Sequence, residues 1–246
     1  MKRRKIKFPL VPVVAVALLS LILVTCFLYI GKRLLGMDFF VVKDVLVNEE
    51  REGFEHFKGR NIFDIDLKDD AEYLSGLYPD YKKVRIIRVL PDRIYVDFIK
   101  RIAVAFVKHY RYFSVDSDYI FFSPTRITGQ DSALPIILGL ETKVFGPKSG
   151  RRYKVKELEL AMRIIEGFKE RRRLRNFRLK SIKVASPEKT VLVLAGGIQV
   201  KIADREIEKK LDILGDLLAS LKNEIENISY IDLRFSEPVI KPKNAK

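Results

Sequence analysis

Residues 8–30, FPLVPVVAVALLSLILVTCFLYI, decide how the rest of the chain must be interpreted. The stretch holds 23 residues without a charged side chain, and fifteen of them are Leu, Ile, Val or Phe. A helix of this length reaches about 35 Å, and the hydrocarbon core of a bilayer is about 30 Å thick. The sequence therefore predicts a transmembrane helix from Phe8 to Ile30 that anchors the protein in a lipid bilayer.

Basic residues flank this segment unequally. Five precede it and two follow it closely, and residues 1–33 contain no acid. The positive-inside rule makes residues 1–7 a cytoplasmic tail and places everything after Gly31 outside. A cleaved signal peptide is the alternative, but the apolar stretch is too long and no small-residue cleavage site follows it. We expect a single-pass protein of the cytoplasmic (inner) membrane with an extracytoplasmic, periplasmic body.

The first part of the body, residues 38–103, alternates strand and helix patterns. A strand is expected at 39–47, a helix at 67–78 with Asp66 as its N-cap, and two strands near 84–90 and 94–98. The carboxylates of Asp64 and Asp66 could suggest a catalytic pair, but side chains two residues apart diverge and no nucleophile is near. We expect a small α/β domain with its helical region on a three-stranded sheet.

The second part, residues 104–236, is richer in strands. A hairpin is expected at 111–122, helices at 154–172 and 204–221, and a final strand at 229–235. Asp204 is the expected cap of the second helix. The fold class is therefore α+β: an N-terminal transmembrane helix, a small α/β domain, then a larger antiparallel sheet with two amphipathic helices. Residues 237–246 form a C-terminal tail.

The residue types needed for chemistry do not assemble in the sequence. Cys26, the only cysteine, lies in the apolar segment, so an intrachain disulfide and a cysteine metal site are excluded. His56 and His109 have no ligand-like neighbours, and no phosphate-binding or nucleophile motif appears. We expect no enzymatic activity, no cofactor, no metal and no small-molecule substrate.

The strand and helix order of residues 38–103 resembles a POTRA domain. Within it, the run Asn61-x-Phe63-x-Ile65-Asp66, Pro79 and the spacing Arg88-x-x-Pro91 are similar to the FtsQ/DivIB family of bacterial cell-division proteins. Arg101 and Ala103 also match the family, whereas Lys100 stands where an acid is common, so the resemblance implies no ion pair there. The family's β-domain is matched by Val115-Asp116, Leu134-Pro135 before Gly139, Lys210-Leu211 and Ile231-Asp232-Leu233-Arg234-Phe235.

This resemblance implies a non-catalytic scaffold of the divisome, located at the division septum. Such a protein binds FtsB/DivIC-like and FtsL-like single-pass proteins outside the membrane and links them to septal peptidoglycan synthesis. Its POTRA domain would contact other divisome components. Two alternatives stay open: a POTRA-containing stem subunit of a secretion or envelope-assembly system, and an envelope hydrolase.

The final strand is the predicted partner-binding site. An exposed edge strand carries unpaired amides and carbonyls that a partner segment can extend. By position in the family, the candidate residues are Tyr230, Arg234, Phe235, Ser236 and Val239. Arg234 would favour an acidic partner.

The net charge of +15 is shared between the membrane flanks and the body, because removing the seven basic residues of 1–33 leaves +8. The densest basic cluster is Arg171-Arg172-Arg173 with Arg175, Arg178 and Lys180. The predicted topology excludes nucleic acid as its partner. A solvated helix end explains the cluster most simply, and contact with acidic partner segments or anionic envelope polymers is the alternative.

Overall fold

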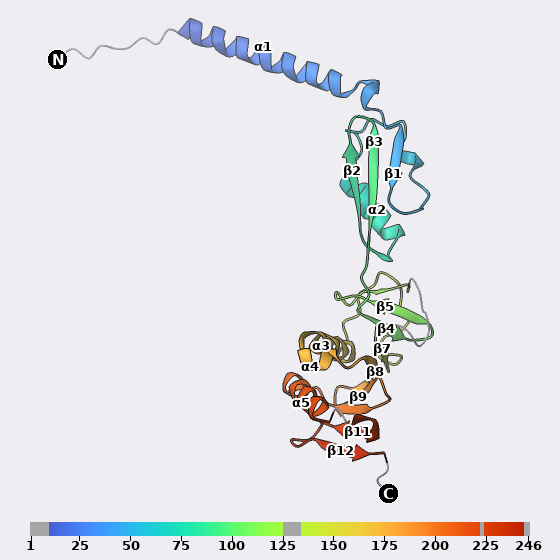
Figure 1. Ribbon diagram of the computed structural model, residues 1–246. Coiled ribbons are helices and arrows are strands. Elements are labelled where there is room, and N and C mark those ends of the chain that lie inside the picture. Colours follow the sequence, from blue (N-terminus) through green and yellow to red (C-terminus); the bar gives the residue numbers. More distant parts are fainter. Residues whose placement is uncertain (1–9, 125–133, 222–223, 244–246) are drawn as a thin grey trace, which may run out of the picture. The chain divides into compact units, whose positions relative to one another are not determined.

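The structure is a computed structural model that describes residues 10–124, 134–221 and 224–243 (Figure 1). The predicted cytoplasmic tail at residues 1–7 and the predicted anchor residue Phe8 lie outside the described residues. The chain divides into two compact units. The first runs to Leu77 and includes Lys83–Ile99, and the second comprises Tyr78–Lys82 and the chain from Lys100 onward.

Helix α1 spans Leu10–Leu35 and carries the predicted membrane segment. Its stretch Val14–Leu35 has a mean hydropathy of 2.6, and none of it is buried inside the protein. A helix that is apolar on all sides and not buried within the described protein suits lipid as its surroundings. The helix passes through Ile30 and ends five residues later, with Lys32 and Arg33 in its last turn, where cations stabilise the helix dipole.

The folded part of the first unit has the predicted strand–helix–strand–strand order. Its elements are β1 (Asp44–Val47), α2 (Leu67–Leu77), β2 (Tyr81–Val89) and β3 (Arg93–Lys100), with two short 3-10 turns, η1 (Asp38–Phe40) and η2 (Glu55–Phe57). The sheet order is β1-β3-β2, and β1 runs parallel to β3. The start of the predicted strand 39–47 is the turn η1 instead; Val41 forms an isolated antiparallel bridge with Asn61, and the strand β1 begins at Asp44.

Asp66 begins helix α2 as expected. Its Oδ1 accepts hydrogen bonds from the amides of Lys68 and Asp69, at 3.0 and 3.1 Å. These amide bonds, Asp69 first, lower the pKa of Asp66 below its ordinary value. Arg88 interrupts the alternation of apolar and polar residues in β2 because it has a structural role. Its guanidinium donates hydrogen bonds to the carbonyls of Ile62 and Ile65 at 2.7 and 2.8 Å.

The second unit contains a nine-stranded sheet in the order β12-β11-β10-β9-β8-β7-β4-β5-β6. The strands are β4 (Ala105–Lys108), β5 (Tyr112–Val115), β6 (Phe121–Phe122), β7 (Ile136–Leu138), β8 (Leu179–Ser186), β9 (Lys189–Leu194), β10 (Gln199–Ile202), β11 (Ile228–Asp232) and β12 (Val239–Pro242). The helices are α3 (Lys156–Glu170), α4 (Arg172–Arg175) and α5 (Ile207–Ser220), with a 3-10 turn η3 (Ile225–Asn227). The hairpin β5–β6 was predicted.

The α+β class is confirmed, but the prediction of an antiparallel sheet was wrong. Strand β7 pairs parallel with both β4 and β8, and β10 pairs parallel with β11. For two of these pairings the physical reason is a crossover helix: α3 lies between β7 and β8 in the chain, and α5 lies between β10 and β11, whereas β5 and β6 lie between β4 and β7. A strand that returns through a helix runs parallel to the strand it left.

The two long helices supply the apolar partner for one face of this sheet. Every second residue of β9 and β10 is buried, as in Leu192 and Val200, and β8 buries Leu179, Ile182 and Val184. The buried faces of α3 and α5, which include Leu158 and Leu211, belong to the same core. Asp204 was wrongly predicted as the cap of α5: its carboxylate pairs with Arg163, and the helix begins at Ile207.

A buried ion pair joins the start of this unit to its first hairpin. Arg101 Nη1 lies 2.8 Å from Asp116 Oδ2, and the two side chains are only 8 % and 6 % exposed. The other oxygen of Asp116 accepts the amides of Asp118 and Ile120. Arg101 therefore has its acidic partner within the hairpin, 15 residues on in the chain.

Candidate functional site: the β11–β12 edge

The large sheet ends in a strand whose outer side is open. Strand β12, Val239–Pro242, is exposed at all four positions. Among the described strands its only neighbour is β11, with which it pairs antiparallel in the register Tyr230↔Lys241, Ile231↔Ile240 and Asp232↔Val239. Figure 1 shows β11 and β12 together at the C-terminal end of the second unit. The backbone groups on the outer side of β12 form the free edge.

The predicted final strand, 229–235, is not this edge. Its paired part is β11, Ile228–Asp232, which lies between β10 on one side and β12 on the other. The connection from Leu233 to Pro238 turns the chain back, and four residues of the predicted tail form the added strand. The template for strand addition is therefore displaced from β11 to β12.

Arg234 is held in an internal ion pair at the end of β11. Its Nη2 lies 2.6 Å from Asp232 Oδ2, and its Nε lies 2.9 Å from Asp232 Oδ1. This hydrogen bonding lowers the pKa of Asp232 and raises the pKa of Arg234. Asp232 is almost fully buried whereas Arg234 is exposed. The charge of Arg234 is thus partly neutralised within the chain.

Tyr230 lies on the same sheet face as two lysines of neighbouring strands. Lys201 Nζ, from β10, is 3.8 Å from the centre of the Tyr230 ring, and Lys241 Nζ, from β12, is 5.9 Å away. Among the residues that the structure describes, neither lysine has an acidic side chain within ion-pair distance. These two ammonium groups, beside an aromatic ring, give the face next to the edge a positive character.

Apolar side chains stand in solvent beside the same edge. Phe235 is 61 % exposed, and Val239 and Ile240 are exposed on β12. Ser236 is exposed in the connection between the strands. The five predicted residues therefore gather on β11, β12 and the connection between them. Sequence reasoning missed Ile240 and Lys241, although the apolar pair Val239-Ile240 between Pro238 and Pro242 was a readable signal for a short edge strand.

The basic cluster near α4 is tied to helix α5. Arg171 donates to Asp212 at 2.6 Å and to Glu208 at 2.9 Å, and Arg173 pairs with Asp216. The hydrogen bond that Arg171 donates to Asp212 is the main cause that raises the pKa of Arg171. Two of the arginines therefore join the helices, which favours the structural explanation of this cluster.

The histidines have structural contacts. His56 lies 3.9 Å from Asp70, and His109 Nε2 is 3.0 Å from the carbonyl of Val144. Residues 10–124, 134–221 and 224–243 contain no group of three or more His, Cys, Asp or Glu side chains placed to hold a metal ion. The candidate site of the described chain is the β11–β12 edge, which presents backbone, apolar and basic groups.

Comparisons with known proteins agree with this architecture. The family model for the C-terminal part of cell division protein FtsQ/DivIB matches residues 105–234, just over half of the chain. The cell division protein FtsQ of Geotalea daltonii is 25 % identical over 191 residues, an alignment that covers 76 % of this chain and 66 % of the relative. The FtsQ of Syntrophotalea carbinolica is 24 % identical over 230 residues, which cover 88 % of this chain and 78 % of the relative. The chain belongs to the FtsQ/DivIB family of cell-division proteins.

Proposed function

We propose that this protein is a non-catalytic scaffold of the divisome, anchored in the cytoplasmic membrane by α1 with its folded units outside. Two observations support the topology. Helix α1 is long and apolar enough to cross a bilayer, and the basic residues before it outnumber those directly after it. In this orientation the β11–β12 edge faces the compartment where septal wall is made.

The proposed mechanism is strand addition at β12. An FtsB/DivIC-like single-pass protein supplies an extended segment that pairs with the outer side of β12, and an FtsL-like protein joins through it. The observation that carries this proposal is that all four residues of β12 are exposed, with apolar Val239 and Ile240 on the strand and exposed Phe235 in the connection before it. Exposed apolar edges promote aggregation unless a partner covers them, and main-chain pairing with side-chain pockets is a common form of peptide recognition.

The charges around the edge indicate the partner's character. Lys201 and Lys241 flank Tyr230, whereas Arg234 is already paired with Asp232. An acidic partner segment would therefore meet the lysines first, and Arg234 would act mainly by holding the turn into β12. Electrostatic complementarity of this kind contributes to specificity and to the association rate.

The first unit is proposed to serve as a POTRA-type module that contacts other divisome components. Its strand–helix–strand–strand order and its three-stranded sheet support this assignment. Together, the two units would hold the single-pass partners near the septal peptidoglycan synthase and link them to its work at the division septum.

The test replaces an edge residue with a charged one. Ile240→Lys places an ammonium group on β12, and Val89→Lys is the matched control, since Val89 lies on the edge strand β2 of the first unit and both residues are 37 % exposed. Binding of a purified FtsB/DivIC-like partner to the full chain in detergent is measured by calorimetry. We expect Ile240→Lys to weaken binding about tenfold or more, or about 1.4 kcal/mol, and the control to bind as wild type. Equal affinity of all three proteins would reject β12 as the site.

A further inference from the structure

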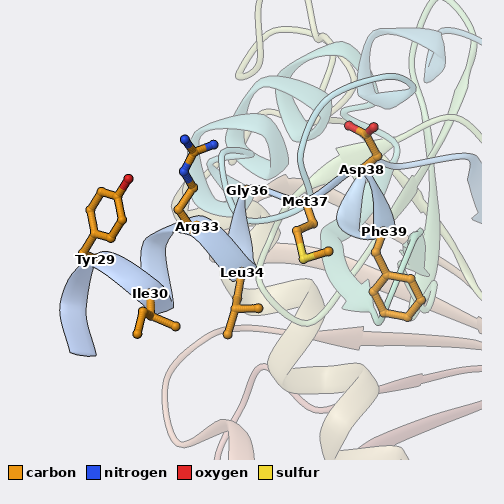
Figure 2. A pocket seen from close by; sticks show the side chains of 8 residues that line it. All are labelled: Tyr29, Ile30, Arg33, Leu34, Gly36, Met37, Asp38 and Phe39. Atoms are coloured by element: carbon orange, nitrogen blue, oxygen red, sulfur yellow. The ribbon is translucent and has the colours of Figure 1, made fainter. Parts of the chain in front are cut away.

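The chain directly after α1 has an amphipathic surface. Leu34, Met37 and Phe39 follow one another over the end of the helix and the turn η1, and all three are exposed, Phe39 to 60 %. Figure 2 shows these side chains and Ile30 on one side of the backbone, while Arg33 and Asp38 point to the opposite side. The apolar side continues the surface of α1 beyond its last turn.

The fold brings a distant phenylalanine to the same place. Asn61 Nδ2 donates to the carbonyl of Leu35 at 2.7 Å, and Asn61 Oδ1 accepts the amide of Phe63 at 2.9 Å. The Phe63 ring lies 5.1 Å from that of Phe40, which in turn lies 5.2 Å from that of Phe39. The interfacial patch is defined here as Leu34, Met37, Phe39 and Phe63.

Two cavities border the last turns of α1 within the first unit. One, of about 660 Å³, is lined by Ile30, Arg33, Leu34, Met37 and Phe39, among others (Figure 2). The other, of about 540 Å³, lies beside Phe27, Leu28, Lys32 and Phe63. Each combines apolar walls with one cationic and one acidic side chain, Arg33 with Asp38 in the first and Lys32 with Asp64 in the second. The apolar walls can contact acyl chains, while the charged side chains lie where a bilayer presents its head groups.

We propose that the interfacial patch inserts into the outer-leaflet interface of the bilayer, so that lipid contacts the first unit as well as α1. Aromatic and aliphatic side chains at the end of a membrane helix gain from burial at the acyl–head-group boundary. Lys32 and Arg33 then lie at the level of the phosphates. Asp38 and Asp64 offset part of this charge, and Asp38 points away from the apolar side. The inference rests on the proposed anchorage of α1.

The chain contains no tryptophan, which makes single-tryptophan variants of the full chain direct depth probes. The probes are Phe39→Trp and Phe63→Trp in the patch, with Leu23→Trp in the middle of α1 as the membrane control. Phe145→Trp is the solvent control, since Phe145 belongs to the second unit and is 81 % exposed. Each variant is placed in lipid nanodiscs with and without lipids brominated near the head-group end of the acyl chains, and the loss of fluorescence is measured.

Phe63→Trp is the decisive variant, because Phe39 is held near the bilayer merely by its closeness to α1 in the chain. We expect brominated lipid to quench Leu23→Trp, Phe39→Trp and Phe63→Trp at least severalfold more than Phe145→Trp. If Phe63→Trp does not fold, Asp64→Trp replaces it as the probe of lipid contact. Asp64 is the next residue in the chain, is exposed, and lines the second cavity.

The outcomes separate the two proposals. If Leu23→Trp is not quenched, α1 does not span the bilayer and the proposed anchorage fails. If Leu23→Trp is quenched but the probe at position 63 or 64 behaves like Phe145→Trp, the anchorage stands and lipid docking of the first unit is wrong. Equal quenching at Phe145 would also overturn the inference, because contact would then not be specific to the patch.

Discussion

Replacing Arg101 with methionine should destabilise the second unit without affecting the first. The substitution keeps most of the side-chain volume but removes the guanidinium that lies 2.8 Å from Asp116. Because both side chains are more than nine-tenths buried, the carboxylate is left in the interior without its counter-charge. Breaking a buried pair in this way costs about 3–5 kcal/mol.

The lower end of that range applies here. Asp116 keeps two hydrogen bonds from the amides of Asp118 and Ile120, at 3.0 and 2.9 Å, so its charge is still partly solvated. A loss of about 3 kcal/mol corresponds to exchange of the most protected amides that is about two orders of magnitude faster. The matched control is Lys143→Met, which breaks the more exposed Lys143–Glu157 pair at 3.3 Å and should cost less than about 1 kcal/mol.

Hydrogen exchange followed by mass spectrometry suits this test because it reports each unit separately. Peptides from β5 and β8 should exchange faster in Arg101→Met, whereas peptides from α2 in the first unit should not change. If the two variants accelerate exchange in β5 and β8 equally, the buried pair does not stabilise the second unit as argued.

Three further predictions concern local structure. Gly139→Ala should destabilise the second unit by about 2 kcal/mol or more in urea unfolding, because φ is +90° and a Cβ would lie 2.6 Å from the carbonyl oxygen of Val184; unchanged stability would contradict this. Because Arg234 lowers the pKa of Asp232, the pair's contribution should be complete above the ordinary aspartate pKa and be lost as pH falls through the lowered value. Arg234→Met should therefore flatten the acid limb of a pH titration of stability, and an unchanged limb would refute the linkage. Asp66→Ala should speed amide exchange at the start of α2 relative to its end, and equal rates would argue against the cap.

Local patterns predicted most elements of the fold. The helix 67–78 was recognisable from its cap and its terminating proline, and it forms as α2 (Leu67–Leu77). The apolar spacing in 154–172 and 204–221 predicted α3 and α5 because each helix must bury one face on the sheet. These signals lie within a few residues of chain, where sequence patterns are most informative.

Features that depend on distant residues were not predicted. Two of the parallel pairings follow from crossover helices, and the succession strand–helix–strand at β7-α3-β8 could have indicated the first of them. Asp116 could not be identified as the partner of Arg101, because only the folded hairpin brings them together. Glu206 precedes α5 with a φ of 54°, so Asp204 is too far back to cap the helix.

Family resemblance indicated which part of the chain holds the candidate site. It did not predict how the strands of that part are arranged. A four-residue strand with every position exposed carries no alternation of apolar and polar residues. The residues of β12 were therefore predicted to belong to the C-terminal tail, 237–246. The role expected of Arg234 also changed, since Asp232 two residues earlier holds its guanidinium. The cations beside the Tyr230 ring are Lys201 of β10 and Lys241 of β12.

The central claim, that a partner strand adds to β12, is tested most directly by the amide exchange of the full chain with and without its FtsB/DivIC-like partner. If the claim is correct, the partner will slow exchange of the outward-facing amides within Val239–Lys241, while β2, the edge of the other sheet, exchanges as before. Protection that appears elsewhere while β12 exchanges at its unbound rate would contradict the account.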